Sequence, residues 1–175
     1  MKRVFVVLLV LLLAGSTVFA ADVGLEFKRD MNAVAGTNPD SYGIIIRNFG
    51  DHYLGFELSA TTPSTLSPAG SIFDNFGYLA SHLGDIQTVN IAPYLLFNYK
   101  ADPTVLYAGI APTINVSKPW PTFDISFKTY SVKAGIQANI LFLGAYAEAI
   151  TNLTVEPSFS MFQAYQVDLG AVFRF

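Results

Sequence analysis

Apolar and polar residues alternate one by one through most of the chain after residue 20. A repeat of two residues is the period of a β-strand, whose successive side chains point to opposite faces. The pattern is clearest at 129–140, and it predicts eight strands in all, at 22–28, 42–48, 53–60, 87–99, 104–117, 129–140, 141–151 and 165–175. Each strand therefore has one face suited to an apolar medium and one face suited to a polar medium.

The connections between these strands alternate in length. Short turns are predicted at 48–52, 100–103 and 139–142, whereas longer connections, richer in Pro, Ser, Thr and Asn, are predicted at 31–41, 61–86, 117–124 and 152–163. Short turns at one end and long loops at the other are typical of outer-membrane barrels, in which the short turns face the periplasm.

We therefore predict an all-β fold, an eight-stranded antiparallel up-and-down transmembrane β-barrel formed by residues 21–175. A closed barrel pairs every strand N–H and C=O with a neighbour, so no sheet edge is left in hydrocarbon. The alternative is a secreted barrel of the lipocalin kind, which has the same alternation but points its apolar residues inward. Pro93 and Pro112 fall inside predicted strands, where a proline costs a ladder hydrogen bond or requires a bulge.

The first twenty residues have a different pattern. A basic start at Lys2 and Arg3 is followed by an unbroken apolar run at 4–14 and then by small residues. This three-part pattern predicts a signal peptide over residues 1–20, cleaved after Ala20. The alternative is an uncleaved membrane anchor, for which the run is short, because a spanning helix needs roughly 17 to 25 apolar residues.

The last predicted strand ends on an aromatic residue. Its segment Asp168-x-Gly170-x-x-Phe173-x-Phe175 resembles the C-terminal strand signature of bacterial outer-membrane β-barrels, in which a polar residue and a glycine precede two alternating aromatic residues. The resemblance implies that these four residues are an assembly signal read by the barrel-assembly machinery. The architecture is similar to the small eight-stranded outer-membrane proteins, the class that includes the OmpA membrane domain, OmpX and OmpW. This resemblance implies a location in the bacterial outer membrane, in contact with its lipid.

The composition agrees with strands in a membrane. Hydrophobic residues make up 52% of the chain and charged residues only 13%, which is low in charge for a soluble protein. The net charge of -3 and the lack of a basic stretch argue against nucleic acid as a partner. Without cysteine, disulfides and thiolate metal sites are excluded. Because the sequence has no phosphate loop, metal-ligand cluster or dinucleotide fingerprint, we expect no cofactor and no metal.

Charges of both signs lie on the polar faces of the predicted strands. They are Glu26, Lys28, Arg47, Glu57, Lys133, Glu148, Asp168 and Arg174. The interior of an eight-stranded barrel is just wide enough for side chains to fill it, and buried charges persist only when they are paired. These residues are therefore predicted to form an ion-pair network in a filled lumen. The alternative is that they line a narrow or gated pore.

Aromatic residues gather near the predicted strand ends, at Tyr42, Phe49, Tyr53, Phe97, Tyr99, Tyr130, Tyr165 and Phe173. Rings of aromatic side chains at the two membrane interfaces explain this pattern without any ligand. Within the longest connection, the spacing of apolar residues at 72–83 predicts a short amphipathic helix that covers the barrel mouth or rests on the bilayer surface.

The sequence favours a protein that is not an enzyme. The histidines are His52, in a predicted turn, and His82, beside Ser81; neighbouring side chains are expected to diverge rather than to form a nucleophile–base couple. The first hypothesis is an outer-membrane barrel with a mostly filled polar lumen and a structural or surface-interaction role through its long loops. The alternative is a narrow, porin-like channel for small or apolar solutes, as in the OmpW-like group. A lipid-modifying barrel enzyme is a third reading.

Overall fold

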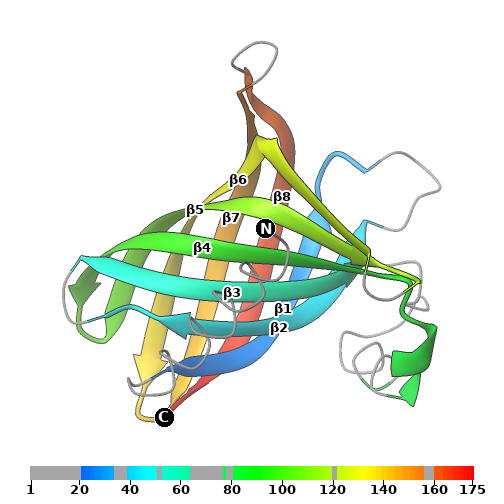
Figure 1. Cartoon of the computed structure of the whole chain (residues 1–175). Helices are drawn as coiled ribbons and strands as arrows, with labels where there is room; N and C mark the ends of the chain where they lie inside the picture. The colour runs from blue at the N-terminus through cyan, green and yellow to red at the C-terminus, as the bar shows by residue number, and fades with distance from the viewer. Residues whose placement is uncertain are drawn as a thin grey trace.

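A computed structural model describes residues 21–33, 39–50, 53–63, 77, 81–119, 122–155 and 160–175. Its strands form one closed barrel, in which each strand pairs in antiparallel fashion with the next one in the chain and β8 pairs with β1 (Figure 1). The strands are β1 (Asp22–Asp30), β2 (Asp40–Asn48), β3 (Leu54–Pro63), β4 (Thr88–Ala101), β5 (Thr104–Ser117), β6 (Thr122–Ile140), β7 (Leu143–Thr154) and β8 (Ser160–Arg174). The predicted eight-stranded up-and-down barrel is confirmed.

Two predictions concern residues outside the described part of the chain. The signal peptide expected over residues 1–20 lies there entirely, and so does most of the helix expected at 72–83. Close to the second of these segments, the described residues include one turn of 3-10 helix, η2 (Leu83–Asp85), just before β4.

Some strands are longer than the alternation predicts. β6 begins at Thr122 rather than at 129, and β8 begins at Ser160 rather than at 165. The connections predicted to be long at 117–124 and 152–163 are therefore short, because β5 pairs with β6, and β7 with β8, up to the residues next to the connection. The β1–β2 and β3–β4 connections are long, as predicted.

The first and last described residues meet at one end of the barrel. The Phe175 N–H donates to the carbonyl of Ala21 over 3.2 Å, and the Arg174 N–H donates to the carbonyl of Phe142, in the β6–β7 turn, over 2.8 Å. In Figure 1 the C-terminus lies beside this turn. We call this end, where the β2–β3, β4–β5 and β6–β7 connections lie, the turn end, and we call the opposite end the loop end.

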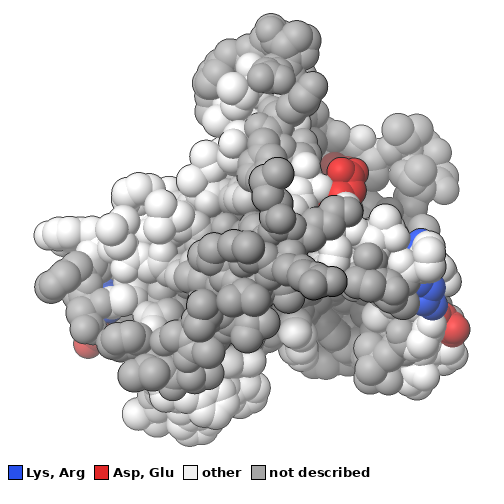
Figure 2. Space-filling model, viewed as in Figure 1, with Lys and Arg blue, Asp and Glu red and all other residues white. Residues whose placement is uncertain are grey.

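Side chains alternate between the lumen and the outer wall. Buried and exposed residues follow one another along most of β1 and β7. The wall exposes large apolar residues such as Leu25, Leu106 and Leu169, which are 49%, 48% and 47% exposed, whereas Glu26 and Asp168 are buried. On the face shown in Figure 2, the visible charged residues lie near the ends of the molecule, and the visible described surface between them is uncharged. An apolar wall around charged residues is the reverse of a lipocalin-like barrel, so that alternative is wrong.

Pro93 and Pro112 share one interruption of the sheet. β4 and β5 pair on either side of the two prolines but not at the prolines themselves. On its other side, β5 shifts register against β6 between Pro112 and Thr113. A proline has no N–H to donate to the ladder, so the irregularity predicted at these positions is confirmed.

The aromatic residues are divided between the wall and sites of full burial. Those exposed on the wall are Tyr53, Phe97, Tyr99, Tyr165 and Phe173, and Tyr130 is partly exposed. The interface position predicted for Phe49 is wrong, because Phe49 continues the inward series of β2 and its ring centroid lies 5.2 Å from that of Tyr107. Tyr42 shares the outward face of β2 with Ile44 and is buried there, with its ring 5.3 Å from that of Phe27, so its interface position stays a prediction.

Candidate functional site in the barrel lumen

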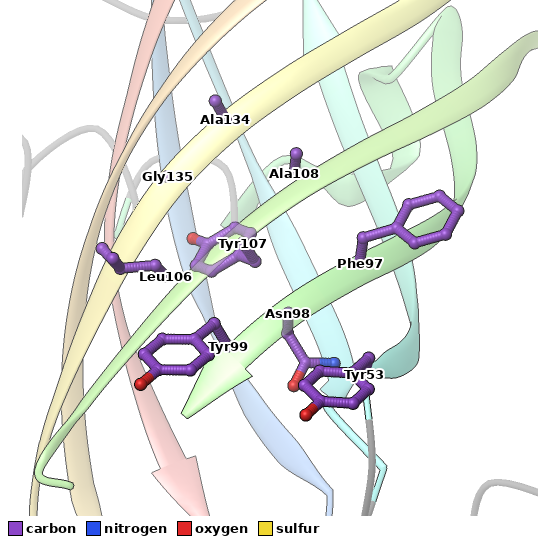
Figure 3. Close-up of a pocket in the computed structure, with 9 residues that line it drawn as sticks. All are labelled: Tyr53, Phe97, Asn98, Tyr99, Leu106, Tyr107, Ala108, Ala134 and Gly135. Atoms are coloured by element: carbon purple, nitrogen blue, oxygen red, sulfur yellow. The ribbon is translucent and has the colours of Figure 1, made fainter. Parts of the chain in front are cut away.

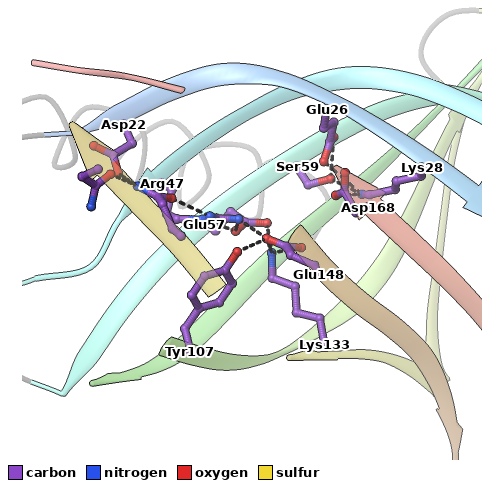
Figure 4. A network of polar contacts seen from close by, with 12 residues as sticks. Asp22, Glu26, Lys28, Arg47, Glu57, Ser59, Tyr107, Lys133, Glu148 and Asp168 are labelled. Atoms are coloured by element: carbon purple, nitrogen blue, oxygen red, sulfur yellow. Dashed lines mark hydrogen bonds and ion pairs between the residues drawn. The ribbon is translucent and has the colours of Figure 1, made fainter. Parts of the chain in front are cut away.

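Four charged side chains meet in the middle of the lumen: Arg47, Glu57, Lys133 and Glu148, which we call the central cluster (Figure 4). Arg47 Nε donates to Glu57 Oε2 over 2.7 Å, and the same guanidinium pairs with Glu148. Lys133 Nζ lies 2.9 Å from Glu148 Oε2 and also pairs with Glu57. Each cation thus contacts both carboxylates. No member of the cluster is more than 3% exposed, so water does little to screen these charges.

Two hairpins supply the central cluster. Arg47 and Glu57 are direct partners in the β2–β3 ladder. Lys133 and Glu148 lie on β6 and β7, where the residue paired with Glu148 is Gly135. In the order of the closed barrel, β2–β3 and β6–β7 stand on opposite sides. The cluster therefore spans the lumen from one wall to the other.

Aromatic and amide groups fill the space around the central cluster. The Tyr107 hydroxyl donates to Glu148 Oε1 over 2.6 Å. The guanidinium carbon of Arg47 lies 4.5 Å from the ring centroid of Tyr107 and 4.6 Å from that of Tyr146. Arg47 also donates to the side-chain oxygen of Gln137 over 2.8 Å. Cation–π contacts and charge-assisted hydrogen bonds both favour an ionised, fixed guanidinium at this position.

Glycines make room for the tyrosine rings in the lumen. A Cβ placed on Gly135 would lie 2.8 Å from the Tyr107 hydroxyl and from Glu148 Cγ. A Cβ on Gly170 would overlap the ring of Tyr146. Glycine at these positions allows a close approach that any side chain would prevent, and the lumen is filled as a result.

A second group of charges lies where β1 meets β8, and we call it the seam cluster: Glu26, Lys28, Ser59 and Asp168 (Figure 4). Lys28 Nζ lies 3.1 Å from Glu26 Oε2 and 3.9 Å from Asp168 Oδ2, and it donates to the Ser59 hydroxyl over 2.7 Å. The Ser59 hydroxyl donates to Glu26 Oε1 over 2.8 Å. Both oxygens of Asp168 are buried and accept no hydrogen bond from the described residues. Two carboxylates share one ammonium here, unlike the balanced central cluster.

Arg174 is the predicted lumen residue that joins neither cluster. Its side chain is 43% exposed at the turn end, with Nε 3.8 Å from Asp22 Oδ1. Asp22 and Gln137 are lumen residues that the sequence analysis did not select. The Gln137 amide donates to Asp22 over 2.5 Å and thereby extends the network from the central cluster toward the turn end. Both residues lie on polar faces of their strands, so the alternation contained the signal for them.

A polar cavity of about 170 Å³ lies between the central cluster and the loop end, and we call it the loop-end cavity. All eight strands contribute to its wall. Lys28 and Tyr94 lie on the side nearer the clusters, and the Tyr94 hydroxyl lies 2.6 Å from that of Ser131. The Lys133 ammonium packs 4.3 Å from the centroid of the Tyr94 ring, so this ring separates the cavity from the central cluster.

The outer wall has an apolar groove of about 450 Å³ near the turn end of β4–β6. Phe97, Tyr99 and Leu106 stand around it, and the small side chains of Ala108 and Ala134 leave it open (Figure 3). A groove of this character on a membrane-facing wall is suited to lipid acyl chains.

The residues of the C-terminal signature lie on both sides of the wall. Phe173 and Phe175 are exposed at the turn end, whereas Asp168 belongs to the buried seam cluster. Gly170 pairs with Glu26 across the β1–β8 seam. Their role as an assembly signal stays a prediction.

Ser81 and His82 lie in the β3–β4 connection, outside the barrel strands. The Ser81 hydroxyl lies 2.9 Å from His82 Nδ1, so the expectation that these side chains diverge is wrong. The same hydroxyl is placed to donate to the carbonyl of Gly77, over 3.1 Å. The contact is exposed and joins two residues that are neighbours in the chain. His52 lies outside the described residues.

In the part of the chain that the structure describes, no helix has the length and apolar character needed to cross a bilayer. Among those same residues, no group of three or more His, Asp and Glu side chains is arranged to hold a metal ion.

Solved outer-membrane barrels share this fold. The N-terminal β-barrel domain of Pseudomonas aeruginosa OprF aligns with a TM-score of 0.53 and 13% identity, over 89% of this chain and 97% of that one. Outer membrane protein H (OprH) of P. aeruginosa aligns with a TM-score of 0.54 and 14% identity, over 90% of this chain and 100% of that one. No family model and no curated protein matches the chain. The predicted likeness to small eight-stranded outer-membrane barrels is confirmed at the level of the fold.

Proposed function

We propose that this chain, which has the fold of the small outer-membrane barrels, is an integral protein of the bacterial outer membrane with a closed lumen. Its role is structural, or it is an interaction with molecules at the cell surface through the loop end. The observation that carries the proposal is the central cluster, in which two cations and two carboxylates join opposite walls inside an apolar cylinder.

The packing around the central cluster supports a barrel that does not conduct. Tyr94, Tyr107 and Tyr146 surround the four charges, and all three tyrosines are buried. An ion crossing the lumen would have to displace these rings and separate paired charges, and a buried pair is costly to break. The alternative function, a narrow channel for small or apolar solutes, requires an open path through these residues.

The proposal also covers export and assembly. Residues 1–20 are a cleaved signal peptide, and residues 21–175 form the exported barrel domain. The segment Asp168 to Phe175 presents its two aromatic side chains on the outer wall, where the barrel-assembly machinery has access to them during insertion. No catalytic step is proposed.

Conductance in planar bilayers tests the closed lumen. The refolded protein is expected to give no steady, discrete openings. Steady openings of one size would contradict the closed barrel and favour the channel.

The variant Lys133→Met separates a structural cluster from a pore lining. Losing one cation leaves Glu57 and Glu148 with Arg47 alone, so we expect the free energy of unfolding to fall by about 3 kcal/mol, with no gain of conductance. Urea titration in lipid vesicles, followed by gel mobility, measures the first effect. The control is Lys118→Met, because Lys118 is an exposed lysine that donates to the carbonyl of Gly84 outside the lumen. Equal stabilities of the two variants would argue against a structural cluster.

A further inference from the structure

The loop-end cavity has many side-chain hydrogen-bonding groups for which the described residues provide no partner. Within the described part of the structure, no hydrogen bond to protein is made by the side chains of Ser41, Thr61, Asn90, Thr113, Asn152 and Gln166, all of which line the cavity. They come from six different strands, one from each of β2, β3, β4, β5, β7 and β8. Buried polar side chains ordinarily have a hydrogen-bond partner in the protein or in ordered water, so these groups are available to water or to a bound molecule.

The charges around the cavity favour a neutral occupant. Lys28 is the one ionisable amine among the lining residues, and Glu26 and Asp168 already hold its ammonium group. An anion in the cavity would contact the Lys28 ammonium, but the two carboxylates next to that ammonium would repel it. A cation would face Lys28 and would find no carboxylate in the wall. Among the residues that line the cavity, therefore, neither an anion nor a cation finds an uncompensated opposite charge.

The size of the cavity limits what it can hold. Its volume of about 170 Å³ corresponds to about six water molecules at roughly 30 Å³ each. One sugar ring with its hydroxyl groups is of this size. Hydroxyl and carboxamide side chains offer both donors and acceptors, which is what a ligand with several hydroxyl groups requires.

We propose that the loop-end cavity is a binding site for a small, neutral, hydroxyl-rich molecule of the size of one hexose ring. The hydroxyl groups of Thr61 and Thr113 and the amides of Asn90, Asn152 and Gln166 hold the ligand. Tyr94 closes the inner side of the site. The site ends at the central cluster, so the molecule enters and leaves on the loop side. This inference goes beyond the proposed function, because it assigns a ligand class to a cavity inside the barrel and does not depend on whether the lumen is closed to ions.

Titration with D-glucose tests the proposal, with the purified protein in detergent micelles. Nuclear magnetic resonance of the side-chain amides of Asn90, Asn152 and Gln166 is the readout. We expect saturable shifts of these signals in the millimolar range, because the ligand is small and makes only neutral hydrogen bonds. Choline and acetate are titrated in parallel as charged probes and are expected to give no saturable shifts.

Matched substitutions locate the binding. Thr61→Val combined with Thr113→Val removes two hydroxyl groups with little change of shape, and we expect binding of glucose to weaken by about tenfold. Thr104→Val is the control, because Thr104 begins β5 at the turn end, away from the cavity. If the double variant gives a poor spectrum, Asn152→Leu alone serves the same purpose.

Three results would overturn the proposal. One is the absence of saturable glucose shifts at the three amides. Another is undiminished glucose binding by the well-folded double variant or by Asn152→Leu. The third is saturable binding of choline or acetate without binding of glucose, which would assign the cavity to a charged ligand. None of these results bears on conductance, so the closed lumen is judged separately.

Discussion

At the residue scale, the lumen is filled by large side chains that lie against positions with no side chain. Tyr107 lies against Gly135, and the ring of Tyr146 lies against Gly170. The Tyr107 hydroxyl reaches Glu148 only because Gly135 leaves the space. The alternation marks Gly135 as an inward position, but it does not tell which ring from a neighbouring strand uses the gap. That depends on how strands pair, and pairing is not local in sequence.

Gly135→Ala tests this contact. A methyl group 2.8 Å from the Tyr107 hydroxyl and from Glu148 Cγ must displace both side chains, so we expect a loss of about 1–3 kcal/mol in the free energy of unfolding. Gly84→Ala is the control, because a Cβ on Gly84 meets no atom within 4 Å. Urea titration in vesicles gives both values. A change at Gly135 no larger than that at Gly84 would mean that the lumen is loosely packed.

At the element scale, β6 shows what alternation can and cannot reveal. In 122–128 the apolar residues occupy odd positions, and in 129–140 they occupy even positions. The phase changes where the register against β5 shifts, with Pro112 paired to Tyr130 but Thr113 paired to Ser126. Residues 122–128 do not fit the alternation of 129–140, which is why the sequence predicted that the strand starts at 129. By contrast, β5 runs over the predicted 104–117, because its alternation keeps one phase through most of its length.

Replacing a carboxylate by an amide is expected to have different effects on stability in the two clusters. Glu148→Gln leaves Arg47 and Lys133 with one carboxylate, so we expect a loss of about 3 kcal/mol in the free energy of unfolding. Asp168→Asn removes the carboxylate that the seam cluster has in excess, so we expect that free energy to stay the same or to rise. The refolded variants are compared by urea titration, which avoids any effect on cellular assembly. A loss at Asp168 as large as that at Glu148 would show that Asp168 is an essential partner of Lys28.

At the scale of the whole molecule, the apolar wall and the charged interior are two results of one alternation. The sequence predicted the fold, the outward face and the charged members of both clusters. Each of these follows from the alternation, which shows on which face of its strand a residue lies. It could not predict that the charges divide into a balanced central cluster and an unbalanced seam cluster. That division depends on which strands face one another across the lumen, and strands that are far apart in the chain do so. Phe49 was misplaced for a similar reason, because an aromatic residue next to a turn fits the wall and the lumen equally well.

A charge on the wall tests the position of the molecule in the bilayer. Ala147 and Leu143 both face outward on β7, and Leu143 begins the strand at the turn end. Four residues along a tilted strand move Ala147 about 10 Å deeper. We expect Ala147→Arg to cost about 2–4 kcal/mol in vesicle unfolding and Leu143→Arg about 0–1 kcal/mol. Equal costs at the two positions would contradict a wall that spans the bilayer.

The central cluster is built from two hairpins, and this determines when its ion pairs can form during insertion into the membrane. The β2–β3 hairpin carries Arg47 opposite Glu57, and the β6–β7 hairpin carries Lys133 and Glu148. In each hairpin, one cation and one carboxylate of the central cluster can therefore pair before the barrel closes. The contacts across the barrel axis, from Arg47 to Glu148 and from Lys133 to Glu57, become available only when the ring of strands is complete. Closure of the barrel thus converts two separate ion pairs, one in each hairpin, into a single network of four charges.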